Sequence, residues 1–369
     1  MECSLETLLK YEQPTKYIVA SEEYSDEYPI PVLTAGKSFI LGYTNEENGI
    51  CRASISPVII YDDFTTDSKY VDFDFKVKSS AMKILHQINK EDNLRYLFYV
   101  VSYLKYTPFS HKRTWISDFS KFRIKYRLPI EQNAIVSELD KIQAALDNKK
   151  EQLKKLDELI QSKFYEMFGD PVVNDKGWKM KNLGEISKVK IGPFGSLLHN
   201  HDYIKGGIPL VNPIHMSNEK ICPDYNFSVS NEKIKELQNY ILQTDDILLA
   251  RRGDIGRCAL VGKEENGFLC GTGSLFVRPI KSVNSIFIVK LIRCNSMIKY
   301  LTSFAKGITM LNINCKIVEQ LPIILPPLPL QQAFAAYVEK VEQAKAIVNQ
   351  EIAHLQELLN SRMDYYFRK

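Results

Sequence analysis

Two pairs of adjacent carboxylates are the first candidates for chemistry in this chain. Asp62-Asp63 and Asp245-Asp246 fall at the ends of predicted strands, where paired carboxylates could bind a metal ion and cleave a phosphodiester bond. Aspartates in such places more often close turns, because their side chains accept hydrogen bonds from nearby backbone N–H groups. The two pairs therefore favour turns, and metal-dependent nuclease chemistry is kept as the alternative.

Other catalytic motifs are missing from the sequence. There is no G-x-x-x-x-G-K-[ST] phosphate loop, no H-E-x-x-H and no G-x-S-x-G. Cys270-Gly-Thr-Gly-Ser274 is predicted to be a tight turn, and Asn212-Pro-Ile-His215 is only a fragment of the motif with which amino-methyltransferases hold a base. The seven cysteines form no C-x-x-C pair, which favours reduced core thiols over zinc ligands. We therefore expect no catalytic residue, no cofactor and no metal site.

Short basic and polar segments point to contact with DNA. The net charge is only +4, so any basic surface must be local. Loops that carry Arg, Lys or short polar side chains can reach phosphates and base edges. The alternating segment 121–127 is also basic, but taken alone it favours the solvated face of a strand over a DNA contact. The candidate DNA-contacting residues are Gln13, Thr15, Lys16, Thr34, Lys37, Asp63, Thr65, Lys76, Lys78, His111, Lys112, Arg113, Phe194, Ser196, Asn212, His215, Arg251, Arg252 and Arg257.

Two long helices are expected to position these loops. Residues 131–168 and 329–369 are rich in helix formers, and apolar residues in both recur at alternating steps of four and three, the seam of a coiled coil. The two seams superpose, since 199 residues separate Ile135 from Phe334 and also Met167 from Tyr366. The residues expected in helix packing or partner contacts are Gln132, Ile135, Leu139, Ile142, Leu146, Leu153, Leu156, Ile160, Gln331, Phe334, Val338, Val341, Val348, Ile352, Leu355 and Leu359.

One lysine interrupts each seam, Lys149 in the first and Lys345 in the second. A charge at such a position can fix register and partner choice. Alternatively, the aliphatic stem lies along the seam and the ammonium group reaches solvent. The sequence leaves both interpretations open.

The remaining blocks, 1–130 and 169–328, resemble diverged copies of each other. Ile30–Gly36 is similar to Ile208–Ile214, and short β-rich runs alternate with turns in both. A chain of 369 residues with 45% hydrophobic and 25% charged residues is ordinary globular material for two to three domains. The fold class is therefore predicted as α+β, with a repeat of about half the chain. No signal peptide or membrane span is evident, so a cytoplasmic location is expected.

Taken together, the sequence resembles the specificity (S) subunit of type I restriction-modification systems over nearly its whole length. The resemblance is carried by Met167–Val172 with Gly177-Trp178, by Gly192–Ser196, and by the Pro-x-x-x-Gln helix starts that contain Gln132 and Gln331. Tyr11–Val19 and Leu33–Tyr43 are similar to one type of first recognition domain in the family.

The resemblance implies two target-recognition domains, 1–130 and 169–328, held apart by two antiparallel spacer helices in a pseudo-twofold arrangement. Each domain would read one half of a bipartite site in double-stranded DNA. The helices would set the gap and dock two methyltransferase subunits, which restriction subunits join in the full complex. The chain itself would be a non-catalytic subunit. The alternative, from another class, is a coiled-coil scaffold that binds proteins and not DNA.

Geometry bounds the expected target. A helix of about 36 residues rises about 54 Å, which equals at most about 16 base pairs at about 3.4 Å each. Two half-sites centred about one turn apart would fit on one face of the duplex. The resemblance implies half-sites of about three to five base pairs with a gap of about five to eight. The first block lacks a Gly-Trp lead like 177–178, and we expect the segment 365–369 to supply the missing contact.

Overall fold

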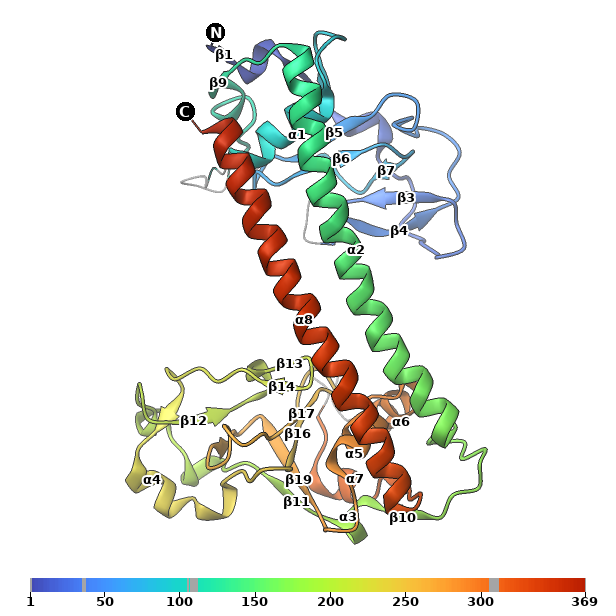
Figure 1. Ribbon diagram of the computed structural model, residues 1–369, viewed down its shortest axis with the longest axis vertical. Coiled ribbons are helices and arrows are strands. Elements are labelled where there is room, and N and C mark those ends of the chain that lie inside the picture. The colour runs from blue at the N-terminus through green and yellow to red at the C-terminus, as the bar shows by residue number, and fades with distance from the viewer. Residues whose placement is uncertain (1, 35–37, 105, 107–111, 305–311, 369) are drawn as a thin grey trace. The chain divides into compact units, whose positions relative to one another are not determined.

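The computed structural model describes residues 2–34, 38–104, 106, 112–304 and 312–368. Its contacts divide the chain into two compact units. The first unit contains Met1–Lys150 and Gln350–Lys369, and the second contains Glu151–Asn349. Each unit combines sheets, short helices and one half of each of two long helices (Figure 1). The predicted α+β class is confirmed.

A four-stranded antiparallel sheet with the order β2-β8-β5-β6 lies at the centre of the first unit. A second sheet, β4-β3-β7, pairs β3 parallel to β7, and α1 packs on the four-stranded sheet. A short ribbon of β1 and β9 lies at the start of β2. The bounds are β1 Glu2–Ser4, β2 Leu9–Glu12, β3 Ile30–Leu33, β4 Ile40–Thr44, β5 Val58–Asp62, β6 Ser68–Val71, β7 Lys76–Val77, β8 Met82–Gln87, α1 Leu94–Tyr103 and β9 Arg123–Lys125.

The second unit repeats this plan, as the similarity between the two sequence blocks predicted. Its sheets have the orders β11-β19-β16-β17 and β15-β12-β18, with β12 parallel to β18 and a ribbon of β10 and β20. The bounds are β10 Met180–Asn182, α3 Leu183–Ile186, β11 Ser187–Ile191, β12 Ile208–Val211, β13 Met216–Ser217, β14 Lys220–Ile221, β15 Ser228–Val229, α4 Asn231–Glu236, β16 Ile247–Ala250, β17 Cys258–Leu260, β18 Leu269–Cys270, β19 Ser274–Pro279, α5 Ser285–Ile292, α6 Asn295–Phe304, α7 Cys315–Glu319 and β20 Pro322–Ile324.

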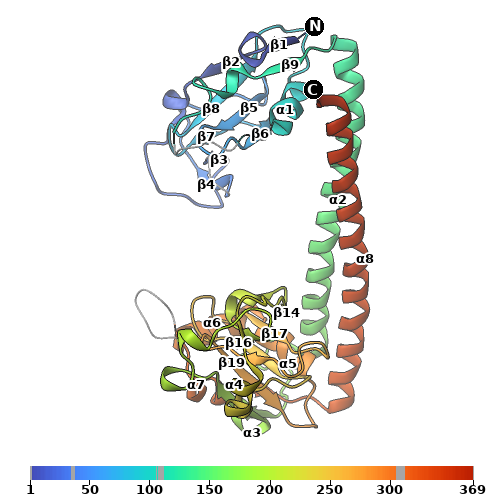
Figure 2. The same cartoon turned by 90° about the vertical axis from the view of Figure 1, so that its left-hand side faces the viewer.

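The long helices are α2 (Pro129–Phe168) and α8 (Leu328–Phe367), of 40 residues each. Both begin slightly before the predicted positions, because a proline fits the first turn of a helix, where its missing N–H is not needed. Within each unit α2 and α8 run side by side in opposite directions (Figure 2). Lys149 lies 2.8 Å from Glu351 in the first unit, and Lys345 lies 2.6 Å from Asp157 in the second.

These ion pairs bear on the two seam lysines. Lys345 is also 2.9 Å from Glu342 on its own helix. Burial would lower the pKa of Lys345, but the hydrogen bonds to Asp157 and Glu342 outweigh it and raise that pKa. Each lysine therefore pairs with a carboxylate of the facing helix, which favours a role in helix register over a solvated ammonium group.

The seam residues complete the cores of the units. Ile135, Leu139, Ile142 and Leu146 of α2 and Leu359 of α8 are buried in the same cluster as α1, with Ile352 and Leu355 packed against it. In the second unit, Ile160, Phe334, Val338 and Val341 are buried in the core, and Leu156 packs on it. Val348 is buried and Leu153 is half-buried. The long helices thus contribute core residues to both units as well as joining them.

A buried glutamine fastens each long helix to its domain. Gln132 Oε1 accepts the N–H of Asn93, the N-cap of α1, at 2.7 Å, and Gln331 Oε1 accepts the N–H of Asn284, the N-cap of α5, at 3.0 Å. The amide Nε2 groups donate to Arg127 O at 2.9 Å and Pro326 O at 2.8 Å. Both side chains are fully buried, so their contacts are internal and they are unavailable to a partner subunit.

The end of α8 packs on the first domain. Phe367 lies against Tyr96 and Tyr103, and the Tyr103 hydroxyl donates to Asp364 at 2.8 Å. The expected contact between the C-terminal segment and the first block is confirmed. Among the described residues, no helix combines the length and apolar character needed to cross a membrane.

Candidate nucleic-acid interface

The loops singled out in the second unit emerge from one edge of its four-stranded sheet. β11 ends at Ile191 opposite Leu275, and β16 ends at Ala250 opposite Ser274. Strand pairing therefore brings together the loops 192–197, 251–257 and 271–273, although they are far apart in sequence. The turn that follows β12, beginning at Asn212, joins them.

A glycine turn, Gly271–Gly273, holds these loops together. Gly271 donates to Val211 O at 2.9 Å, Gly273 donates to Asn212 Oδ1 at 3.0 Å, and Gly273 O accepts the N–H of Arg251 at 3.0 Å. A Cβ at Gly192 would lie 2.1 Å from Gly271 O, and a Cβ at Gly271 would lie 2.7 Å from Val211 O. Glycine is required because the backbones approach this closely. The Gly-rich run is thus a packed turn in which the N–H groups of Gly271 and Gly273 are already bonded, as expected of a structural turn.

The Asn212–His215 segment is a rigid 3-10 turn. The ring Nδ1 of buried His215 lies 3.0 Å from Leu210 O and 3.2 Å from the N–H of Asn212. Arg257 donates from Nη1 to Pro213 O at 3.2 Å and from Nε to Asp254 at 3.0 Å. These bonds leave Ile214 at the tip, 81% exposed. The sequence interpretation missed Ile214, although an apolar residue inside a polar turn was a visible signal.

Several side chains at this edge are open to solvent. Phe194, Ser196 and Arg252 are exposed. Burial, helped by the neighbouring Arg252 charge, lowers the pKa of Arg251, and the buried Nε of Arg251 has no hydrogen-bond partner in the described part of the chain. Two arginines at one loop can offer planar donors to phosphates or to guanine.

The first unit presents the same edge. β2 ends at Glu12, β5 ends at Asp62 opposite Met82, and β6 begins nearby at Ser68. The loops from 13 to 17, from 63 to 67 and from 78 to 81 therefore lie together. Thr34 follows β3, and its hydroxyl donates to Ser38 O at 2.8 Å.

Exposed candidates in the first unit are Gln13, Thr15, Lys16 and Thr65. Lys16 pairs with Glu12 at 2.7 Å, and the hydrogen bonds that its ammonium group donates to Glu12 and Tyr17 raise the pKa of Lys16. Lys16 is therefore cationic at neutral pH, on a short 3-10 turn (Pro14–Tyr17).

Lys112 and Arg113 lie near the same edge of the sheet, because the two residues that follow them are hydrogen-bonded to Asp63 after β5. Thr114 donates its N–H to Asp63 Oδ1 at 3.0 Å, and Trp115 does so at 2.9 Å. Both cationic side chains are exposed, and Lys112 is 3.2 Å from Asp118. Two other candidates, Lys37 and His111, lie outside the described residues.

Other candidate DNA-contacting residues are buried or half-buried and bind groups inside the protein. Asp63 is fully buried, anchors segment 112–115 and lies 3.2 Å from buried Lys83. Lys76 lies 2.6 Å from Glu46 and donates to Asn48 O at 2.6 Å. Half-buried Lys78 pairs with Glu22. Asp63, Lys76 and His215 hold loops in place, and their side chains are buried in this structure.

Asp246 and Asp62, from the two carboxylate pairs, also hold the fold together. Asp246 is buried and receives two hydrogen bonds from Arg278, at 2.7 Å to Oδ1 and 2.6 Å to Oδ2. Asp62 Oδ1 accepts the N–H of Phe64 at 2.8 Å. The observed geometry supports the turn and anchoring interpretation over nuclease chemistry.

The family model and two curated relatives that match this chain belong to type I restriction specificity subunits. Residues 175–357 match the family described as the type I restriction modification DNA specificity domain. The EcoR124I/EcoR124II specificity subunit of Escherichia coli is 37% identical over 260 residues, covering 67% of this chain and 63% of that protein. The MjaIX specificity subunit of Methanocaldococcus jannaschii is 25% identical over 252 residues, covering 63% and 57%. The matches thus span less than two thirds of these relatives.

Two solved structures share the fold. The type I restriction-modification S subunit from M. genitalium has a TM-score of 0.55 at 14% identity, covering 100% of this chain and 96% of that one. A chain from a structure describing complex assembly and conformational transition of the type I R-M system has a TM-score of 0.56 at 17% identity, covering 99% and 96%.

Proposed function

Because the chain belongs to the family of type I restriction-modification specificity subunits, we propose that it is the non-catalytic subunit that selects the DNA target of such a complex. The observation that carries this proposal is the repeated sheet edge. Both units gather loops at the equivalent edge of an equivalent sheet, and both edges expose basic and polar side chains. Two such edges suit a target of two separate half-sites.

The proposed recognition domains are 1–130 and 169–328, with spacer helices at 131–168 and 329–369. In the first domain Gln13, Thr15, Lys16, Thr65, Lys112 and Arg113 are proposed to contact DNA. In the second domain the proposed contacts are Phe194, Ser196, Arg251, Arg252 and Arg257. The buried anchors Asp63, Lys76 and His215 are left out of both sets.

The proposed partners follow from the family. Two methyltransferase subunits would bind the chain and modify adenine, and restriction subunits would join the full complex, in the cytoplasm where chromosomal DNA is available. A protein-binding scaffold without DNA recognition is not favoured by the comparisons.

Mapping N6-methyladenine across a genome tests the proposal. The chain is co-expressed with its methyltransferase subunit, and sites are compared with those from cells that express the methyltransferase alone. We expect one two-part motif with a fixed gap. A stable complex that gives no methylation, or methylation without a two-part motif, would contradict the proposal.

A further inference from the structure

An apolar residue lies at the tip of a turn on the basic edge of the second unit. Ile214 follows β12 in the 3-10 turn Pro213–His215, and it is 81% exposed. Single exposed apolar residues are common on protein surfaces and need no explanation by themselves. Ile214 differs from such residues in the way its turn is held and in the charges that lie beside it.

The turn is fastened on both sides of Ile214. Before it, the side-chain oxygen of Asn212 accepts the N–H of Gly273 at 3.0 Å. After it, the N–H of His215 donates to Asn212 O at 2.9 Å, and the buried His215 ring packs on Phe227 with 5.6 Å between the ring centroids. Because the turn is already ordered, an apolar contact made by Ile214 costs little conformational entropy on binding.

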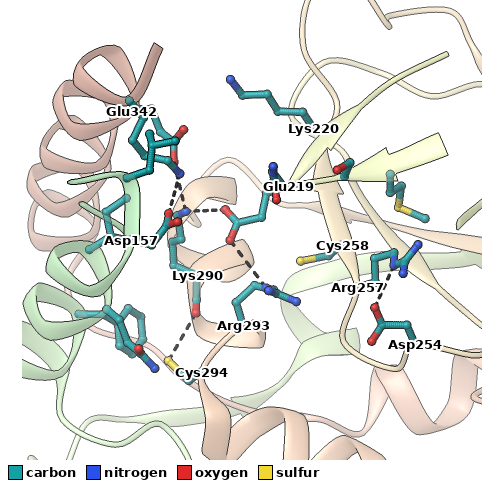
Figure 3. A pocket seen from close by; sticks show the side chains of 18 of the residues that line it. Asp157, Glu219, Lys220, Asp254, Arg257, Cys258, Lys290, Arg293, Cys294 and Glu342 are labelled. Carbon is teal, nitrogen blue, oxygen red and sulfur yellow. Dashed lines mark hydrogen bonds and ion pairs between the residues drawn. The ribbon is translucent and has the colours of Figure 1, made fainter. Parts of the chain in front are cut away.

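The loop 251–257 brings positive charge to the turn. Arg257 donates from Nη1 to O of Pro213, the residue before Ile214, at 3.2 Å, and its Nε lies 3.0 Å from Asp254 (Figure 3). The start of this loop carries two further arginines, one of them exposed. Three arginines against one aspartate leave a net positive charge, so Ile214 is an apolar group on a cationic surface.

The corresponding position of the first unit has no such side chain. In the similarity between Ile30–Gly36 and Ile208–Ile214, the residue that corresponds to Ile214 is Gly36, which lies outside the described residues. Glycine has no side chain with which to make an apolar contact. A contact made by Ile214 therefore belongs to the second unit alone.

Base edges offer one apolar group to a protein. In the major groove, the C5-methyl group of thymine lies among the hydrogen-bond donors and acceptors of the other base edges. The planar donors of arginine suit guanine O6 and N7 in the same groove. An isoleucine beside arginines thus matches a major-groove surface that includes a thymine methyl group.

We propose that Ile214 is a specificity-determining residue of the second unit, and that its side chain packs against the C5-methyl group of a thymine in the half-site which that unit reads. The inference rests on the proposed function and assigns one base contact within it. An apolar side chain can instead act as a wedge between base pairs in the minor groove. Such a wedge would not depend on the methyl group, and this difference decides the experiment.

Replacing thymine with deoxyuridine removes only the C5-methyl group. Duplexes that contain the motif from the methylation map are made with one deoxyuridine at a time, at each thymine of both half-sites. Fluorescence anisotropy then measures their affinity for the complex of the full chain with the methyltransferase subunit. We expect deoxyuridine at one position, in only one half-site, to weaken wild-type binding about fourfold through the loss of one buried methyl group.

Variants of Ile214 assign that loss to its side chain. Ile214→Ala should bind the thymine duplex about fourfold to tenfold more weakly. Deoxyuridine at the sensitive position should then cost nothing further, because the methyl group has already lost its partner. Ile214→Val, which keeps a branched apolar side chain, should retain most of the sensitivity. Ile280→Ala, an exposed isoleucine just after the opposite end of β19, is the matched control and should behave as the wild type.

The outcomes separate the inference from the proposed function. Equal deoxyuridine penalties in the wild type and in Ile214→Ala at every position would overturn the inference. Weaker binding of Ile214→Ala to all duplexes alike would assign Ile214 to a wedge or to the DNA backbone, and would also overturn it. A chain that yields no two-part motif would reject the proposed function itself, and the methylation map shows that result before any deoxyuridine duplex is made.

Discussion

At the scale of single residues, burial separates side chains of the same type into anchors and contacts. Asp63 and Lys76 are buried and bonded within the first unit, whereas Arg252 is exposed on a loop of the second unit. An anchor acts on DNA recognition only through the loop that it holds. A contact residue should change DNA affinity without changing the fold.

Arg252 provides a direct test of the second edge. Arg252→Ala should reduce DNA affinity about tenfold and lower the slope of log affinity against log salt by about one, because one phosphate contact is lost. Fluorescence anisotropy of the complex with a labelled duplex over a salt series measures both values. Lys263→Ala, an exposed cation in the turn after β17, should leave them unchanged. A wild-type slope in Arg252→Ala would exclude the phosphate contact.

A substitution of Gln331 tests whether this buried side chain anchors α8 to the second unit. Gln331→Ala leaves the Asn284 N–H and Pro326 O without a partner in a buried place, which should lower the free energy of unfolding of the second unit by about 2–4 kcal/mol. Urea unfolding followed by hydrogen exchange in α5 measures this loss. Gln332→Ala, at the exposed neighbouring position, should change stability by less than about 0.5 kcal/mol. Equal midpoints for the two variants would count against the anchor.

Sequence patterns predicted where the loops are, but not which of their side chains are buried anchors and which are exposed contact residues. Gly, Pro and short polar residues mark loops locally, so the turn at Gly271 could be placed from the sequence. Burial depends on residues far along the chain: the partners of Asp63 lie 51 and 52 residues away. The recurrence of Gln132 and Gln331 at one offset was visible, but their bonds to Asn93 and Asn284 required the tertiary structure.

At the scale of elements, each long helix keeps one heptad pattern over its whole length. Its apolar residues pack into the core of the first unit in one half and into the core of the second unit in the other half. Heptad periodicity is local and repetitive, which is why both helices could be predicted from the sequence. The first unit adds a polar clamp, in which Glu138 accepts hydrogen bonds from Arg362 and from the Tyr366 hydroxyl. The equivalent position in the second unit has Lys163 over the ring of Tyr337, at 5.9 Å.

The Glu138 clamp should make the first unit sensitive to acid. Hydrogen bonds from Arg362 and Tyr366 lower the pKa of Glu138 from 4.5. A carboxylate with a lowered pKa stabilises the fold at pH values above its unfolded pKa, and that contribution is lost as the pH falls through the folded pKa. Glu138→Gln should therefore lose less stability than the wild type between about pH 6 and about pH 3.

Thermal unfolding of the first unit at several pH values checks this expectation. Glu357→Gln, an exposed carboxylate on α8 of the same unit, should follow the wild-type curve. If Glu138→Gln also follows that curve, the clamp does not contribute to the pH dependence.

The end of α8 should be needed by the first domain. A chain that stops after Ser361 lacks Asp364, Tyr366 and Phe367, and so loses the contacts to Glu138, Tyr96 and Tyr103. We expect faster hydrogen exchange in α1 and loss of DNA binding at the first half-site, with the second unit unchanged. A chain ending at Phe367 is the matched control. Normal exchange in α1 of the shorter chain would show that the aromatic contacts are dispensable.

At the scale of the whole molecule, two continuous helices of 40 residues join units that each possess their own core. If the helices set the spacing of the two half-sites, their length should determine the gap in the DNA target. The sequence predicted this plan through its internal repeat. It could not predict the bases, because recognition depends on loop placement and on DNA deformation.

Removing one heptad from both helices tests the spacing. Deletion of residues 149–155 together with 348–354 shortens each helix by about 10.5 Å, or about three base pairs. We expect the methylated motif to keep both half-sites while its gap shrinks by about three base pairs, or methylation to stop where the phase of the duplex no longer fits. Deletion of 149–155 alone should disrupt the pairing of the helices. A motif with an unchanged gap would reject the spacing role.

The separate cores of the two units have a consequence for evolution. Since each unit closes its own core around its own half of the helix pair, a mutation in one set of loops need not disturb the folding of the other unit. If each unit reads one half of the DNA target, as proposed, natural selection can alter one half of that target while the other half stays fixed. The specificities within reach of such a chain grow as the product of the variants of its two halves, not as their sum.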